Sequence, residues 1–177
     1  MSNALLELNE DQTSAQDPWT VAQGAKNGKP LIVRYRSERP QDVDAVAFPF
    51  LLSATWTYQP DELGLPSSEE MVLMDKLEDA LASSLEGSNT AHLMVILTGN
   101  GERDWLWYTS GEDEAMRQVN QALKGHKPYP VEFSVQKDRA WKAHTQFVAG
   151  NDSAPHGDGA FGIIRRALAK AMNAVCR

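Results

Sequence analysis

The stretch 92–109 constrains the fold more than any other part of the sequence. An apolar run, 92–97, precedes the turn Gly99-Asn100-Gly101, and an aromatic run, 103–109, follows it. Glycine and asparagine tolerate the positive φ angles that tight hairpin turns need. The first run is apolar at successive positions, as expected of a central strand buried on both faces. The segment therefore predicts an antiparallel hairpin inside a sheet.

Four further segments have the pattern of β-strands. Residues 19–23 and 31–36 flank Asn27-Gly28, so they predict a second hairpin. In 50–58 and 131–135, apolar residues alternate with largely polar ones. That period of two is typical of a half-buried antiparallel strand.

Three segments predict helices. Ser67 and Glu70 form a capping box at the start of the first, and Ser110 and Asp113 are positioned to cap the second. Asp138 is an N-cap candidate for a short third helix. The expected buried residues are Met71, Met74, Leu77, Leu81 and Leu85 in the first helix, Met116, Val119 and Leu123 in the second, and Trp141 with Phe147 or Val148 in the third.

The order of these elements predicts an α+β fold. A β-hairpin arm precedes a β-α-β-β-α-β series, which is the ferredoxin-like arrangement: a two-layer antiparallel sheet with helices on one face. The other face would be covered by the arm, by a C-terminal helix or by a second subunit, or it would be a binding surface. Trp56, Trp105 and Trp107 lie on these strands, and we predict that they form an apolar protein-binding centre.

Charge is distributed unevenly along the chain. The 177 residues carry a net charge of −7, with 24 acidic and 17 basic side chains. Residues 161–177 hold four cations and no acid, which leaves −11 on residues 1–160. An acidic body repels phosphate backbones, so we expect no nucleic-acid partner. An acidic rim would instead steer a basic protein partner toward the chain.

The two ends of the chain differ in composition from its middle. We expect a flexible N-terminus over 1–17, an α+β domain over 18–149, a Gly-rich linker over 150–160 and a basic amphipathic helix over 161–177. Ser2-Asn3-Ala4 is similar to a purification-tag scar. The helix has an apolar stripe of Phe161, Ile164, Leu168, Met172 and Val175. It would dock on its own domain, on a partner subunit or on a membrane surface.

Several quoted segments together resemble a known bacterial family. They are Trp19, Asn27-Gly28-Lys29-Pro30, the acidic helix 77–81, the hairpin 97–109, and Tyr129-Pro130-Val131-Glu132-Phe133 followed by Asp138 and Trp141. Over about residues 18–148 the chain resembles the family known as domain of unknown function 695. Some members are fused to a domain similar to the protein regulator of ribonuclease E, which implies protein binding. The family supplies no catalytic residues to carry over.

Signatures of established chemistry are missing from the sequence. It has no P-loop, dinucleotide-binding, zinc-protease or serine-hydrolase motif, and its four His have no metal-ligand spacing. We therefore expect no cofactor and no metal. The single Cys176 forms no internal disulfide, and no segment is apolar enough for a membrane span, so we expect a cytoplasmic protein. His156 and Asp158 lie in the linker, where we interpret them as solvated.

Two side-chain sets are candidates for ligand contact. Arg34 and Arg36 share one face of a strand, where such a pair can clamp an anion. Glu132 could act as a general base, with His126 and Arg103 as helpers. Our leading hypothesis is a non-enzymatic protein-binding or regulatory module, such as an inhibitor or immunity-type protein. The alternatives are a ligand-binding protein or hydrolase-type enzyme with a pocket beside the sheet, lined by Arg34, Arg36, His126 and Glu132, and a homo-oligomeric structural module.

Overall fold

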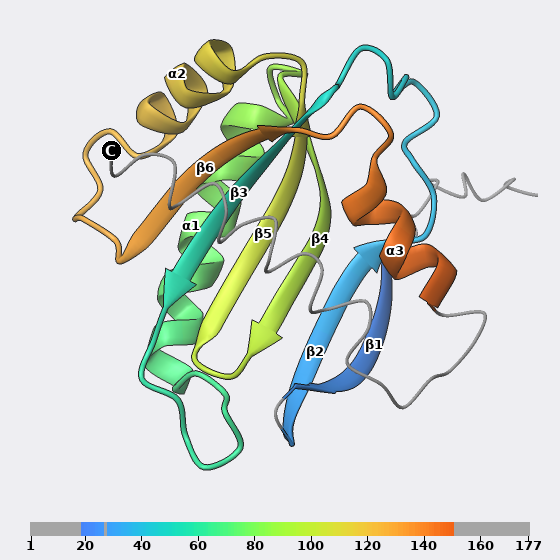
Figure 1. The fold of residues 1–177 in the computed structure, drawn as a ribbon. Coiled ribbons are helices and arrows are strands. Elements are labelled where there is room, and N and C mark those ends of the chain that lie inside the picture. Colours follow the sequence, from blue (N-terminus) through green and yellow to red (C-terminus); the bar gives the residue numbers. More distant parts are fainter. Residues whose placement is uncertain (1–18, 27, 151–177) are drawn as a thin grey trace, which may run out of the picture.

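The strands and helices follow one another along the chain in the predicted order. The computed structural model describes residues 19–26 and 28–150 (Figure 1). The elements are β1 (Trp19–Lys26), β2 (Lys29–Arg36), β3 (Phe50–Thr57), α1 (Ser68–Leu85), β4 (Ala91–Gly99), β5 (Glu102–Thr109), α2 (Glu112–Ala122), β6 (Val131–Lys137) and α3 (Lys142–Gly150). The α+β class is confirmed. The expected elements in 1–17 and 161–177 lie outside the described residues.

All six strands belong to one antiparallel sheet, in the order β1-β2-β4-β5-β3-β6. The hairpin formed by β1 and β2 is not a separate arm: it extends the sheet beyond β4, where Arg34 is opposite Ile96. The predicted central hairpin is confirmed. Gly99 pairs with Glu102, and Asn100 and Gly101 between them have φ angles of 56° and 85°. Two successive positive φ angles are characteristic of a type I′ turn.

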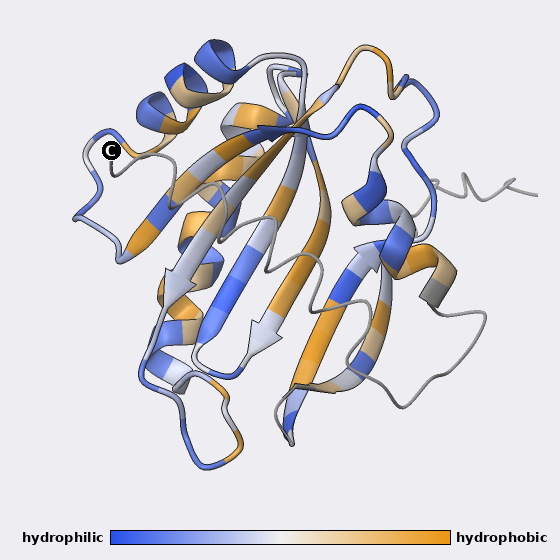
Figure 2. Cartoon of the chain, viewed as in Figure 1, coloured by the Kyte–Doolittle hydropathy of each residue, from blue (hydrophilic) through white to orange (hydrophobic). Residues whose placement is uncertain are grey.

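Helices α1 and α2 cover one face of the sheet (Figure 1). The predicted stripe of α1 is confirmed at Met74, Leu77, Leu81 and Leu85, which are buried, whereas Met71 is half-buried. They pack against β-strand residues of this face, including Trp56, Trp105 and Trp107. Figure 2 shows β4 hydrophobic over most of its length and α2 largely hydrophilic. The helix layer therefore covers the most aromatic part of the sheet.

Helix α3 lies on the opposite face, which corrects the expectation of helices on one face only. Trp141 stacks on Tyr108 with ring centroids 3.8 Å apart, and both belong to the core that Leu106 and Val33 share. Asp138 caps α3, since its carboxylate accepts hydrogen bonds from the backbone N–H groups of Lys142 and Ala143. The short α3 thus packs against the sheet surface that α1 leaves uncovered.

Strand β3 is buried on both faces, although alternation in 50–58 predicted a half-buried strand. Ser53, on the side away from α1, is only 1% exposed. The polar residues that alternate along β3 are small, so they can be packed under another layer of the protein as readily as they can face water. Alternation alone therefore did not distinguish a solvent face from a covered face.

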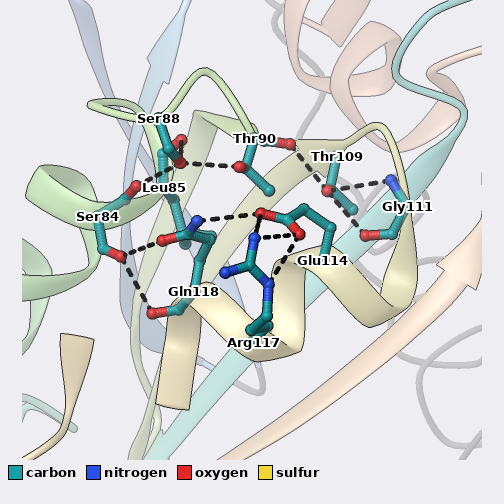
Figure 3. Close-up of polar contacts among 9 residues, drawn as sticks. All are labelled: Ser84, Leu85, Ser88, Thr90, Thr109, Gly111, Glu114, Arg117 and Gln118. Carbon is teal, nitrogen blue, oxygen red and sulfur yellow. Dashed lines mark hydrogen bonds and ion pairs between the residues drawn. The ribbon is translucent and has the colours of Figure 1, made fainter. Parts of the chain in front are cut away.

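A polar network joins α2 to α1 and to the loop before β4 (Figure 3). The Ser84 hydroxyl donates to the backbone oxygen and the side-chain oxygen of Gln118. The Gln118 amide in turn donates to Glu114, which also pairs with Arg117. The N-cap of α2 is Gly111, and it has no side-chain cap bond. The prediction that Ser110 and Asp113 cap α2 is wrong, because the helix begins one residue later than expected of a Ser110 cap.

Candidate functional site

A pocket of about 330 Å³ lies beside the N-terminal half of α1, between the helix and strands of the sheet. We call it the α1 pocket. Its apolar walls come from β2, β4, α1 and the loop before α1, and three polar side chains complete the lining. The lining residues are Ile32, Arg34, Leu65, Pro66, Met71, Ile96, Thr98 and Arg103.

The two arginines of the α1 pocket share one carboxylate. Oε1 of Glu78 accepts a hydrogen bond from Arg34 (2.8 Å), and Oε2 accepts one from Arg103 (3.1 Å). The indole N–H of Trp105 donates to the same Oε2 at 2.9 Å. The Glu78 side chain is 15% exposed. Its carboxylate is therefore poorly hydrated, and three hydrogen-bond donors hold it. These four side chains form what we call the Glu78 cluster.

Arg103 is the most deeply buried charge of the cluster, with a side chain only 4% exposed. Its guanidinium lies 5.1 Å from the ring centroid of Trp105 and 3.9 Å from the carboxylate of Asp75. Burial lowers the pKa of this guanidinium, while Glu78 and Asp75 raise it. Its Nε–H has no hydrogen-bond partner among the described residues. The buried guanidinium of Arg103 therefore keeps one N–H group without a hydrogen-bond partner in an apolar environment.

Trp19 lies close to two cations at the outer side of the cluster. The guanidinium carbon of Arg34 is 4.9 Å from its ring centroid, and that of Arg36 is 5.2 Å away. A cation over an indole face is attracted by the ring quadrupole. The contact holds Arg34 in place although its side chain is 41% exposed.

The predicted anion contacts have different environments. Arg34 lines the α1 pocket. Arg36 is buried and forms an ion pair with Glu86 at 3.0 Å. Only Arg34 of this pair therefore faces a space that a ligand could enter.

The three tryptophans predicted as a protein-binding centre lie in the core. Trp105 and Trp107 are fully buried, and Trp56 is 1% exposed. All three pack beneath α1 and α2. A partner protein does not reach the three indole rings in this arrangement. Because the rings are packed in the core, these aromatic strands do not make the surface of the protein apolar.

The four side chains predicted to line one pocket are not assembled, which corrects that hypothesis. His126 follows α2, and its ring contacts the Tyr129 hydroxyl at 2.9 Å. Glu132 is exposed on the edge strand β6, beside Val131. Arg103 belongs to the Glu78 cluster and not to Glu132. The predicted general base therefore has neither helper beside it.

Within the described ranges, no group of three or more His, Cys, Asp or Glu side chains could hold a metal ion. His156 and Asp158 lie outside those ranges. A second hollow, of about 440 Å³, lies between α3 and residues 37–43. Its His144 is engaged with the backbone oxygen of Arg36 at 2.7 Å, and we assign it no ligand.

Glu78 was missed at the sequence level, although two signals identify it. It follows Met74 by four residues and precedes Leu81 by three, so it lies beside the buried stripe of α1. Arg103, Trp105 and Trp107 alternate along β5, so the cation shares the face of two buried indoles. A carboxylate and a guanidinium on two facing buried surfaces must be paired.

The fold and the site define an α+β protein with a six-stranded antiparallel sheet and an arginine-lined pocket beside its first helix. The chain belongs to a family of unknown function (DUF695), whose model matches residues 17–149. The resemblance inferred from the hairpin and its flanking segments is thereby confirmed. Comparison with the curated proteins finds no match. No helix in the described part of the chain is long and apolar enough to cross a bilayer.

Proposed function

We propose that the protein is a non-enzymatic binding module and that its α1 pocket takes a small organic anion with an apolar body. The observation that carries the proposal is the pair of guanidinium groups, Arg34 and Arg103, in a pocket whose other walls are almost entirely apolar. Ligand pockets typically combine apolar walls with a few convergent polar groups. At about 330 Å³ the pocket suits a small ligand.

Charge in the pocket favours an anion. Two guanidinium groups share the single, mostly buried carboxylate of Glu78, and the other carboxylate beside them, Asp75, lies 3.9 Å from Arg103 with its side chain 62% exposed to water. The hydroxyl of Thr98, which also lines the pocket, supplies a further donor. A carboxylate or phosphate group of the ligand would accept from this hydroxyl and from Arg34, while its apolar part would contact Ile32, Ile96 and Met71.

The same lining disfavours catalysis. The eight side chains include no carboxylate, imidazole or thiol that could act as a base or nucleophile. Glu78 behind them does not line the pocket, and its carboxylate already accepts hydrogen bonds from three donors. The α1 pocket would therefore bind its ligand without converting it.

Titration of the full chain with hexanoate, followed by ¹H–¹⁵N NMR, tests the pocket. We expect shifts concentrated at the β2, β4 and α1 amides around Ile32, Ile96 and Met71, and weaker shifts with the neutral analogue hexanamide. Arg34→Met removes the exposed cation and keeps an apolar stem. Because a hydrogen bond to a charged group contributes about 1.5–3 kcal/mol, affinity should fall by about tenfold or more.

Arg117→Met is the matched control, because Arg117 is also an exposed arginine paired with a glutamate but lies on α2. Its affinity for hexanoate should equal that of the unmodified chain. Equal loss in both variants, or equal shifts with hexanoate and hexanamide, would show that the α1 pocket does not select an anion.

Recognition of a protein partner is a second candidate, and one observation favours it. Leu63, Val72 and Leu73 are 58%, 53% and 42% exposed. They belong to the same stretch of chain that supplies Leu65, Pro66 and Met71 to the pocket. Exposed apolar side chains gathered in one stretch are typical of a docking surface. This surface replaces the buried tryptophans as the place where a partner would bind.

We also propose that the core formed by β3 to β6 with α1 and α2 has the ferredoxin-like arrangement. Its support is the strand order β4-β5-β3-β6, together with α1 and α2 on one face. In that arrangement β1 and β2 are an addition at the β4 edge. The addition matters for function, since Arg34 of β2 completes the Glu78 cluster.

A further inference from the structure

The sheet face opposite α1 presents apolar side chains over most of its width. Leu31 and Val33 of β2, Leu97 of β4 and Leu106 of β5 point to this side, because they belong to the core that α3 joins. Helix α3 packs at one end of the face, where Trp141 stacks on Tyr108. No other helix or loop of the described part of the chain crosses the middle of this face in Figure 1.

These side chains are nevertheless shielded from water. Leu106 is 0% exposed, Val33 2% and Leu97 7%. Between them and β6, Ser53 is 1% exposed, and its buried hydroxyl has no hydrogen-bond partner within the described ranges. A side chain on an uncovered sheet face would keep much of its surface in water. The burial therefore calls for an additional layer on this face.

We infer that the C-terminal segment 161–177 of the same chain forms this layer. Its apolar residues Phe161, Ile164, Leu168, Met172 and Val175 recur at helical spacing and match an apolar sheet face. Its four cations match the acidic side chains of the same face: Asp104 of β5 and Glu132 of β6 lie one on each side of Thr55.

The lengths are compatible with this placement. The described chain ends with α3 at Gly150, beside β2, since His144 contacts the backbone oxygen of Arg36. Ten residues of linker, 151–160, span up to about 33 Å when extended. A 17-residue helix is about 26 Å long, whereas the four strand spacings from β2 to β6 add up to about 19 Å. The segment is long enough to cross the face.

The N-terminal segment 1–18 is a poorer candidate for the same place. It contains Glu7, Glu10, Asp11 and Asp17 and no cation. Placed on this face, these acids would repel Asp104 and Glu132. A second copy of the chain is the other possible cover, and the test distinguishes it.

The only thiol in the chain, Cys176, carries the probe. A nitroxide spin label attached there in the full chain should broaden ¹H–¹⁵N resonances of β3, β5 and β6 and leave those at the exposed side of α1 sharp. A mixture of spin-labelled unenriched chain with unlabelled ¹⁵N chain separates the two covers. Broadening that disappears in the mixture supports the intramolecular placement. Broadening that persists in the mixture, or that never affects the sheet, overturns it.

Two substitutions in the full chain give an independent measurement. Leu168→Asp places a carboxylate in the apolar stripe, and Asn173→Asp makes the same change in net charge away from the stripe. We expect Leu168→Asp to lower the midpoint of thermal unfolding by about 4 °C or more, as loss of one buried leucine does in a chain of this size. Asn173→Asp should leave it nearly unchanged. Equal midpoints for the two variants would overturn the inference.

Discussion

Glu78 is the residue on which the α1 pocket depends. Its carboxylate joins α1 to β2 through Arg34 and to β5 through Arg103 and Trp105. Burying a charge is unfavourable unless it is paired and hydrogen-bonded, so the three donors are needed to keep it in place. The cluster therefore fixes the distance between α1 and the strands that form the pocket floor.

Glu78→Gln tests this role. The substitution keeps the shape of the side chain but leaves the guanidinium of Arg103 buried without its main partner. Removing one member of a buried pair typically costs about 3–5 kcal/mol, and we expect a loss of that size in urea unfolding. Glu114→Gln is the matched control, because its pair with Arg117 is on the surface and should cost no more than about 1 kcal/mol. Similar losses in both variants would contradict the structural role of Glu78.

His144 gives the protein a dependence on pH. Burial lowers the pKa of its imidazole, and the backbone oxygen of Arg36 raises it only in part. Below the ordinary histidine value of about 6.5, the unfolded chain binds a proton that the folded chain does not. The stability contributed by neutral His144 is therefore present above that pH and is lost as the pH falls from that value through the lowered pKa of the folded protein.

Removal of His144 should reduce that dependence. We expect the free energy of unfolding of His144→Gln to decline less between pH 7 and pH 5 than that of the unmodified chain. His126→Gln controls for loss of a histidine, since His126 follows α2 on the surface. If the slope for His144→Gln equals that of the unmodified chain, another group is responsible for the acid sensitivity.

Among the elements, α3 depends most on a single side chain. The carboxylate of Asp138 accepts a hydrogen bond from the Tyr108 hydroxyl at 2.7 Å and two more from backbone N–H groups at the start of α3. Burial and this carboxylate together raise the pKa of the Tyr108 hydroxyl, so the bond is made by a neutral phenol. One carboxylate thus caps α3 and attaches it to the sheet.

Asp138→Ala should release α3 from the sheet. Because several hydrogen bonds to a charged acceptor are lost together, we expect a destabilisation of about 2 kcal/mol or more. Amide hydrogen exchange should quicken first in 142–150. Asp113→Ala is the comparison, since Asp113 lies in the first turn of α2, which has no side-chain cap. Unchanged exchange in α3 would show that packing of Trp141 alone holds the helix.

At the scale of the whole molecule, two cores share the same strands. One core lies beneath α1 and α2 and the other beneath α3, and both draw residues from β3, β4 and β5. Trp105 and Trp107 belong to the first core, and Leu106 and Tyr108 between and beside them belong to the second. Loss of either core would remove support from the strands of the other.

We therefore expect unfolding in a single transition. Tryptophan fluorescence reports mainly on the core beneath α1, whereas far-UV circular dichroism reports on all the secondary structure. The two urea curves should coincide in midpoint and slope, as in two-state unfolding. Separate midpoints would show that the cores unfold independently.

Local sequence patterns were sufficient to predict most of the strands and helices. The Gly99-Asn100-Gly101 turn, the N-cap at Ser67 and the buried stripe of α1 from Met74 to Leu85 are local patterns, and the structure has each of them where it was predicted. Backbone conformation at such places depends on residues within a few positions of one another. A single sequence therefore contains the information needed to predict them.

Which faces are buried and which charges meet depends on contacts between residues far apart in the sequence. Glu78 is 44 positions from Arg34 and 25 positions from Arg103 along the chain, and the three side chains meet because β2 pairs with β4 beside α1. The three tryptophans lie on β3 and β5, which pair with each other, and they pack beneath α1 and α2 instead of on a surface. Strand order and face assignment depend on long-range packing, which local periodicity does not encode. For that reason the candidate site lies in the arginine-lined α1 pocket and not at the three tryptophans.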